Sequence, residues 1–118
     1  MPATNKNKGI VCLSFTRRNK NYADKIKRYL LKSGFAIADM INSANYFVPL
    51  ITDDYSISGD AGYVLKLALS EAEAGKLKII PLKIEHGGIP PKLKTRDLIN
   101  FIGNFDAGLV LLEKALTK

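Results

Sequence analysis

The sequence is poor in the residues that build disulfides, metal sites and histidine-based catalytic groups. Its 118 residues include one cysteine, Cys12, one histidine, His86, and no tryptophan. A single cysteine excludes an internal disulfide and a cysteine-based zinc site, and a single histidine excludes a site with several histidine ligands. His86 precedes two glycines, which is more typical of a surface turn than of a catalytic base. We expect Cys12 to be a buried packing residue.

Long apolar stretches are also absent. No apolar run approaches the roughly 18 residues that cross a bilayer. Residues 1–8 are polar and contain no apolar stretch of the kind found in secretory signals. We therefore expect a cytoplasmic protein with no membrane segment, consisting of a flexible tail at 1–8 and one domain at 9–118.

Basic residues outnumber acidic ones, 18 to 11, for a net charge of +7. Such a chain attracts anions such as nucleotides, nucleic acid or an acidic partner. The cations are spread along the chain, however, and Arg17-Arg18 is the only arginine pair. A solvated basic surface is therefore the simplest interpretation, and nucleic-acid binding is not favoured.

Short β-forming runs alternate with amphipathic segments along the whole chain. This alternation predicts an α/β fold: a doubly wound, mainly parallel sheet of five strands with helices on both faces. Proline is poorly tolerated inside a central strand, so Pro49 and Pro81 make the registers of two strands uncertain. The expected strands are 10–15, 35–38, 46–52, 77–84 and 99–102, and the expected helices are 21–33, 61–74 and 106–116.

The connection between the second and third expected strands is too short for the usual parallel crossover. Only residues 39–45 separate them, whereas such a crossover normally takes a dozen or more residues. Either these two strands are antiparallel, or a segment between about Asp39 and Asn42 is missing.

The order of several motifs resembles the Toll/interleukin-1 receptor (TIR) domain family, especially its bacterial members. The resemblance implies a flavodoxin-like, three-layer α/β/α fold. The family has a long loop and a helix between its second and third strands, so the resemblance favours a missing segment. The motifs are Val-Cys-Leu-Ser-Phe-Thr-Arg at 11–17, similar to the family's first box, and the stretches 22–26, 30–35, 41–44, 46–52, 52–55, 65–69 and 79–82.

Many TIR domains cleave NAD, using one glutamate on the helix after the third strand. A gap-free alignment from Tyr55 to Ala68 places Val64 at that position. Valine cannot carry charge or accept a hydrogen bond, and the nearest acid, Asp60, lies one helical turn earlier and is a weak substitute. The resemblance therefore implies a catalytically degenerate copy without a cofactor or metal, for which NAD or a related nucleotide is a possible substrate or ligand.

The carboxyl ends of the first and third strands are the expected ligand edge, because doubly wound sheets bind ligands there. An aromatic ring could stack on a base and an arginine could hold a phosphate. The alternative is that the arginines are simply exposed and the aromatic ring packs locally. The candidate nucleotide-binding residues are Phe15, Thr16, Arg17 and Arg18 after the first strand, and Asp53 and Tyr55, with Asp54 between them, after the third.

Helix 61–74 has an apolar surface broader than one stripe, which indicates deep burial or an interface with another chain. The first hypothesis is a signalling and assembly module that binds itself or other TIR domains through Val64, Leu65, Leu67 and Ala68. The second is an active NAD glycohydrolase or cyclase of bacterial antiviral immunity. A phospho-acceptor receiver domain would need acids at the end of the first strand, where the chain has Ser-Phe-Thr.

Overall fold

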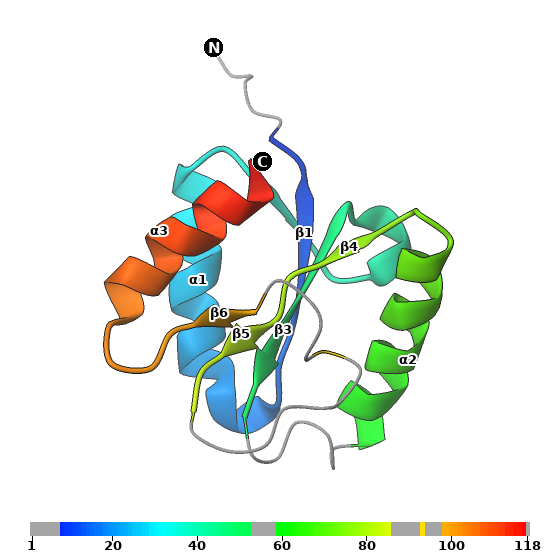
Figure 1. Ribbon diagram of the computed structural model, residues 1–118, viewed down its shortest axis with the longest axis horizontal. Helices are drawn as coiled ribbons and strands as arrows, with labels where there is room; N and C mark the ends of the chain where they lie inside the picture. Colours follow the sequence, from blue (N-terminus) through cyan, green and yellow to red (C-terminus); the bar gives the residue numbers. More distant parts are fainter. Residues whose placement is uncertain (1–7, 53–58, 86–92, 94–97, 118) are drawn as a thin grey trace.

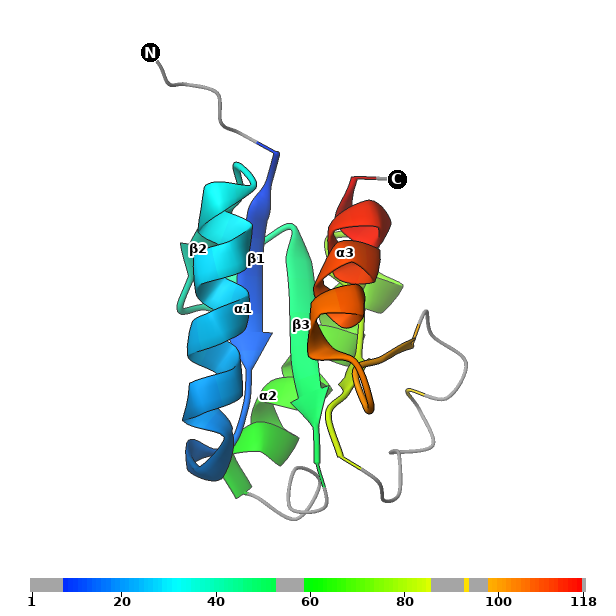
Figure 2. The ribbon, with the colours of Figure 1, turned by 90° about the vertical axis from the view of Figure 1, so that its left-hand side faces the viewer.

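A computed structural model describes residues 8–52, 59–85, Leu93 and 98–117 of the chain. It confirms the predicted α/β architecture, a parallel sheet between two helical layers (Figure 1). Helices α1 (Lys20–Lys32) and α3 (Phe105–Leu116) lie side by side over one face of the sheet (Figure 2). Helix α2 (Gly59–Glu73) lies behind the other face. The fold is flavodoxin-like, as expected.

The strands form one sheet in the order β2-β1-β3-β5-β6, with β4 also paired to β3, and every pairing is parallel. Segments β4 and β5 are two halves of the single strand predicted at 77–84, so the sheet has the five strand positions that the sequence predicts. The strands are β1 (Ile10–Ser14), β2 (Ala36–Ala38), β3 (Tyr46–Ile51), β4 (Lys78–Ile79), β5 (Leu82–Lys83) and β6 (Ile99–Asn100).

The break between β4 and β5 lies where two prolines face each other. Phe47 pairs with Ile79 and Leu50 pairs with Leu82, so the register places Pro49 opposite Pro81. Neither proline has an N–H to donate, which is why the ladder is interrupted here. The strand keeps its course because hydrogen bonds continue on both sides of the gap. Ile80 N donates to Phe47 O at 2.9 Å, and Ile84 N donates to Ile51 O at 3.1 Å.

The connection from β2 to β3 corrects an expectation. The two strands are not antiparallel to each other: both are parallel to β1 and lie on its two sides, and residues 39–45 alone connect them. Their partners on β1 are adjacent residues, since Ala38 pairs with Cys12 and Tyr46 pairs with Val11. The chain therefore only has to cross one strand, roughly 10 Å sideways. Residues 39–45, with the 3-10 turn η2 (Ile41–Ser43), are long enough to do so.

Residues 39–45 suffice as a crossover because β2 is only three residues long. A crossover normally has to return along the full length of the sheet, and this is what requires a helix. Here β2 ends only one register step from the point where β3 begins. The connecting chain therefore needs almost no return along the sheet. Within the described residues, α1 and α3 cover one face of the sheet, whereas α2, the turn η2 and Leu93 lie on the other (Figure 2).

Helix α1 forms where the sequence predicts it, because its apolar residues recur on one side. Ala23, Ile26 and Leu30 are fully buried against the sheet. The helix stops at Gly34, whose φ of 100° belongs to the left-handed region that glycine adopts freely. The predicted tail at 1–8 lies outside the described residues except for Lys8, whose N–H donates to Gly34 O at 3.2 Å.

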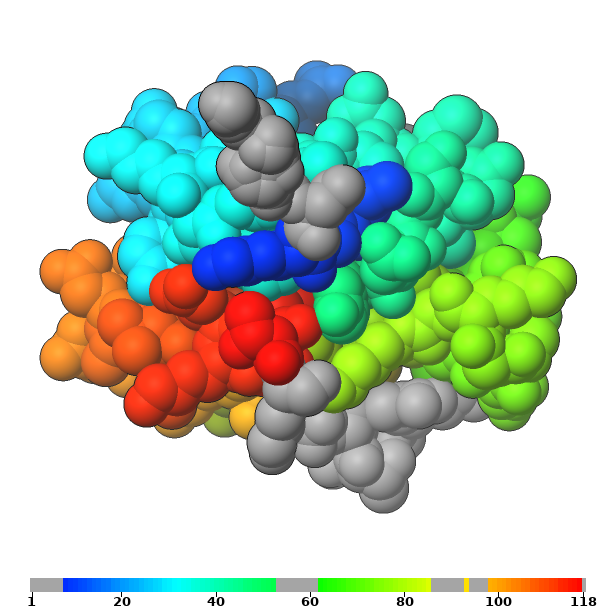
Figure 3. All heavy atoms as spheres, turned by 90° about the horizontal axis from the view of Figure 1, so that it is seen from above, coloured from blue at the N-terminus to red at the C-terminus, as the bar shows by residue number. Residues whose placement is uncertain are grey.

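The sheet separates two hydrophobic clusters. Side chains that alternate along β1 and β3 divide between them: Val11 and Val48 belong to the cluster under α1 and α3, whereas Cys12 and Phe47 belong to the cluster under α2. Seen from above, α1 and α3 gather on one side of the central strands and α2 on the other (Figure 3).

The α1–α3 face is closely packed. The Phe101 and Phe105 rings meet edge to face with centroids 5.1 Å apart, and Tyr22 stacks on Phe105 at 5.8 Å. Gly108 lies so close to the Phe101 ring that an added Cβ would be 2.6 Å from it. The lack of a side chain at Gly108 therefore allows α3 to approach the sheet.

Two tyrosines tie α3 to the rest of this face. The Tyr29 hydroxyl, on α1, donates to a Glu113 carboxylate oxygen of α3 at 2.7 Å. The Tyr46 hydroxyl, at the start of β3, donates to Leu116 O at 2.9 Å. Glu113 and Leu116 both belong to the last turn of α3, so hydrogen bonds as well as apolar contacts fix this end of the helix to α1 and β3. Within the described residues, no helix has the length and apolarity needed to span a membrane.

Candidate functional site

A buried polar network closes the carboxyl ends of β1 and β3. Thr16 and Thr52 follow these strands, and Asn19 is the last residue of the turn η1 (Arg17–Asn19). Asn19 Nδ2 donates to Thr16 Oγ1 at 2.9 Å and to Thr52 Oγ1 at 3.1 Å, and all three side chains are buried. Buried polar groups need such partners. The Thr16 hydroxyl, predicted to contact a nucleotide, therefore faces inward and holds two strand ends together.

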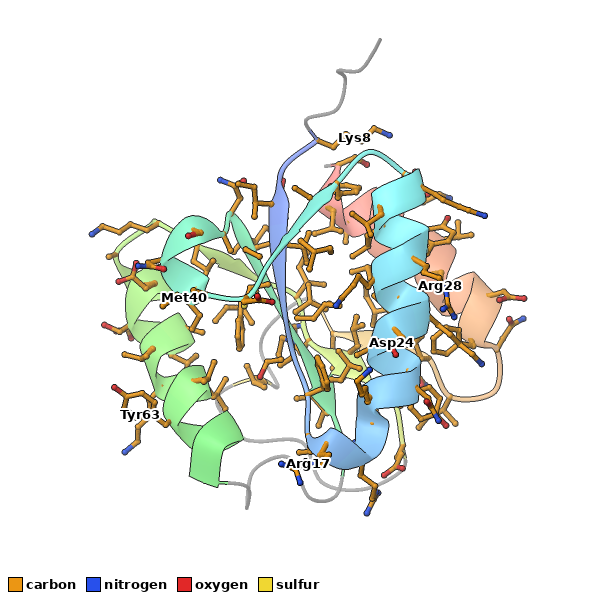
Figure 4. All side chains as sticks on the ribbon, turned by 180° about the vertical axis from the view of Figure 1, so that it is seen from behind. Lys8, Arg17, Asp24, Arg28, Met40 and Tyr63 are labelled. Carbon is orange, nitrogen blue, oxygen red and sulfur yellow. The ribbon has the colours of Figure 1, made fainter. Side chains whose placement is uncertain are left out.

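The two arginines lie at the same edge but differ in their partners. Arg18 Nη2 donates to both carboxylate oxygens of Glu85, which follows β5, at 2.8 and 3.1 Å. With the Arg18 side chain 58% exposed, solvent screens this pair and its contribution to stability is small. Arg17 is exposed and lies at the lower end of the molecule in Figure 4. An anion arriving here would have to compete with Glu85 for Arg18.

A cavity lies on the α2 side of the sheet, and we call it the η2–α2 groove. Its volume is about 520 Å³, within the range of small-molecule sites. Three segments line it: residues 12–15 of and after β1, residues 39–42 leading into η2, and Val64, Leu67 and Glu71 of α2. The groove occupies the side of the sheet where the short β2–β3 connection takes the place of a longer crossover.

The groove brings together two residues that the sequence singled out separately. Phe15, a predicted stacking ring, and Val64, at the glutamate position of the TIR resemblance, both line it. Thr16, Arg17 and Arg18 do not belong to its described lining. Of the predicted nucleotide-binding residues described here, only Phe15 therefore reaches the cavity.

The sequence reading missed the carboxylates of the groove. Asp39 lies at its η2 side and Glu71 at its α2 side. Glu71 could have been found from spacing, because it follows Val64 by seven residues and Leu67 by four, and positions so spaced share one face of a helix. Asp39 lies on the groove because β2 ends at Ala38, beside Cys12 of the groove floor. The sequence did not reveal this register.

Cys12 forms part of the groove floor. It is 3% exposed, as expected for a packing residue. Burial raises the pKa of its thiol, and the negative charge of Asp39 raises it further. Cys12 is therefore a protonated, weakly nucleophilic thiol at neutral pH. The effect of Asp39 also indicates that negative potential reaches the apolar floor.

The four residues predicted to form an interface divide into two pairs. Leu65 and Ala68 are buried in the cluster under α2, with 9% and no exposure, so a partner cannot reach them. Val64 is half-buried and Leu67 is 44% exposed. Only this second pair remains available at the surface, together with Tyr63 on the outer side of α2 (Figure 4).

Several candidates lie outside the described residues: Asp53, Asp54, Tyr55 and His86. Asp60 belongs to α2, but its side chain is not among those described. Among the side chains that are described, no three of histidine, cysteine, aspartate or glutamate gather as they would around a metal ion.

Comparison with protein-family models and with curated protein sequences gives no match. We therefore infer the function of the chain from the groove and its residues.

Proposed function

We propose that this chain is a non-catalytic assembly module of the TIR type, which associates with a second copy of itself through the surface formed by α2 and η2. One observation carries the proposal: three large apolar side chains are exposed on these adjacent elements. Met40 is 63% exposed, Tyr63 66% and Leu67 44%. Apolar groups gathered in this way are typical of surfaces that bind another protein. Other TIR-type domains are partners of the same kind.

The groove supports the non-catalytic part of the proposal. Val64 stands where the TIR resemblance implies the catalytic glutamate, and it lines the cavity together with Phe15. If the groove corresponds to the family's nucleotide pocket, an apolar group replaces the carboxylate that would stabilise the oxocarbenium-like transition state. NAD is then not cleaved, and the described lining of the groove offers no lysine or arginine to hold its phosphates.

A second candidate, NAD cleavage, rests on Glu71. This carboxylate lines the same groove from the same helix, two turns beyond Val64. A carboxylate in the groove is the minimum requirement for stabilising positive charge on a ribose during loss of nicotinamide. In this alternative Glu71 would replace the family glutamate from a different turn of the helix.

The assembly proposal is tested by the mass of the chain in solution. Size-exclusion chromatography with light scattering compares the unmodified chain with Leu67→Lys over a range of concentrations. Leu31→Lys is the matched control, because Leu31 is 53% exposed on α1, at the opposite face. We expect oligomers from the unmodified chain and the control, and monomers from Leu67→Lys. A monomeric unmodified chain at high concentration, or equal loss of association in both variants, contradicts the proposal.

The two candidate functions are separated by measuring nicotinamide release from NAD at high protein concentration. We expect none from the unmodified chain. Release that disappears in Glu71→Gln, while the matched variant Glu73→Gln keeps it, replaces the first candidate with the second. Glu73 is exposed at the end of the same helix and does not belong to the described lining. Val64→Glu then shows whether the family glutamate position can support turnover.

A further inference from the structure

We propose that the η2–α2 groove binds a small molecule that has an apolar or aromatic body and a single positively charged amine. This ligand class goes beyond the assembly function and does not depend on it. It also differs from a nucleotide, whose phosphates need cations. The proposal is built on the shape of the groove, its apolar surface and the sign of its charged groups.

The groove has the size and shape of a ligand site rather than of a packing defect. Its volume of about 520 Å³ is many times that of a water molecule. The β1 strand forms its floor, whereas η2 and α2 form its two walls (Figure 4 shows Met40 beside α2). Walls from separate elements allow a molecule to be enclosed on several sides.

Most of the described lining is apolar. Cys12 and Phe15 contribute from β1 and the residue after it, Met40 from the β2–β3 connection, and Val64 and Leu67 from α2. A flexible methionine and an aromatic ring in the same lining are well suited to contact flat apolar molecules of varied outline. Met40 and Leu67 are 63% and 44% exposed without a ligand, so covering them supplies a hydrophobic driving force.

The charged groups of the described lining are all negative. Asp39 and Glu71 stand on opposite walls, and the described lining includes no lysine or arginine, although the whole chain carries a net charge of +7. No ion pair to Asp39 or Glu71 occurs within the described part of the chain. An amine that enters the groove would therefore meet two carboxylates that are not already engaged by a described cation.

The position of the carboxylates determines which end of the ligand they would hold. Asp39 lies close enough to influence the thiol at the floor, so its charge acts inside the cavity as well as at its rim. Glu71 lies one turn beyond Leu67 on α2. A ligand with its rings on Val64 and Leu67 would place a terminal amine toward Glu71, in the cavity that Asp39 also lines. An anionic or phosphate-rich ligand would be repelled by the same pair.

The test uses three probes with one ring system and different charge: naphthylmethylamine, naphthylmethanol and naphthylacetate. Binding is measured by titration calorimetry at protein concentrations at which the chain is monomeric, and the site is located by amide chemical shifts. We expect the amine to bind about tenfold more tightly than the alcohol, as for a desolvated charge-assisted hydrogen bond. The acid should bind more weakly than the alcohol. The shifted amides should be those of 12–15, 39–42 and the middle of α2.

Variants decide whether the two carboxylates are the cause. In the Asp39→Asn/Glu71→Gln double variant we expect the amine to lose about tenfold in affinity and to match the alcohol. The control Glu73→Gln, also on α2 but outside the described lining, should bind like the unmodified chain. The proposal is overturned if the amine does not bind, if all three probes bind equally, if the double variant keeps the preference for the amine, or if the shifts fall on α1 and α3.

Discussion

The two faces of the sheet are covered by different lengths of polypeptide chain. One face is covered by α1 and α3, which carry the aromatic cluster around Phe105 and the hydrogen bond from Tyr29 to Glu113. The other is covered by α2 and the three-residue turn η2. The first face is closely packed around the Phe101 and Phe105 rings, whereas the second has a cavity of about 520 Å³. The groove lies on the face where the β2–β3 connection is short.

The largest expected difference between the faces concerns equivalent leucine truncations. Leu112 is fully buried under α3, whereas Leu67 is 44% exposed at the groove. Leu112→Ala should lower the free energy of unfolding by about 2–5 kcal/mol, because it leaves a cavity in a closed core. Leu67→Ala should change it by less than about 0.5 kcal/mol. Urea denaturation of both variants checks this, and similar losses would show that the α2 face is as closely packed as the other.

A glycine substitution tests how tightly α3 is held. In Gly108→Ala the new Cβ would lie 2.6–2.8 Å from three atoms of the Phe101 ring. Ring or helix must then shift, which should cost about 1–3 kcal/mol of stability by thermal or urea unfolding.

The double variant Phe101→Leu/Gly108→Ala is the control for that clash. Removing the ring removes its cause, so the combined loss should be smaller than the sum of the two single losses. Strict additivity would mean that the Phe101 ring is not what limits the approach of α3.

The Tyr29–Glu113 hydrogen bond adds a pH dependence to the filled face. The bond, together with partial burial and the nearby charge of Glu113, raises the pKa of Tyr29 above its ordinary value of 10.0. The folded chain therefore holds this proton more tightly than the unfolded chain. Its contribution is fully present below about pH 10 and is lost as pH rises through the folded pKa.

Tyr29→Phe should accordingly lower stability at neutral pH by about 0.5 kcal/mol, the lower end for a hydrogen bond that is only partly buried. It should also make the fall in stability above pH 10 less steep than in the unmodified chain. Unfolding curves between pH 7 and pH 11 measure both effects. An unchanged alkaline slope would exclude Tyr29 as a contributor to it.

The smallest expected effect is that of Asp39→Asn on the alkylation rate of Cys12 at the groove floor. Because burial and Asp39 both raise the pKa of the Cys12 thiol, the folded chain should react with iodoacetamide much more slowly than the chain in denaturant. Asp39→Asn should increase the rate in the folded state, but by less than unfolding does. Mass spectrometry of the alkylated protein follows the reaction. A rate unaffected by Asp39→Asn would mean that burial alone controls the thiol.

The sequence predicted the architecture well because hydrophobic periodicity determines it. The alternation of short β runs with the stripe of Tyr22, Ile26, Tyr29 and Leu30 was enough to place α1 and the order of elements. In the structure Ala23 is buried beside Ile26 and Leu30, whereas Tyr22 is 37% exposed. The interruption at Pro81 was not predictable as a break, because it depends on Pro49 lying opposite, and register is a property of the folded sheet. The β2–β3 connection was unpredictable for the same reason. Residues 39–45 are long enough only because Ala38 and Tyr46 pair with adjacent residues of β1.

The candidate site was predicted less completely. Phe15 and Val64 were singled out for separate reasons, and the structure brings both to one groove. Thr16 was predicted to contact a ligand, but its hydroxyl is held in a buried network with Asn19. Nothing in the sequence shows which way a side chain turns after a strand. Glu71 was overlooked, since a single acid on a helix usually faces solvent.

The brevity of the outermost strands has a consequence of a different kind. β2 contains three residues and β6 two, so each edge of the sheet presents very few unpaired backbone groups. Long, flat edges are the usual templates for strand addition and cross-β aggregation, and short edges protect against both. A chain built this way can expose apolar helix surface at high concentration with little risk of adding strands from its neighbours. Its contacts with other molecules are thereby directed to the broad faces of the fold.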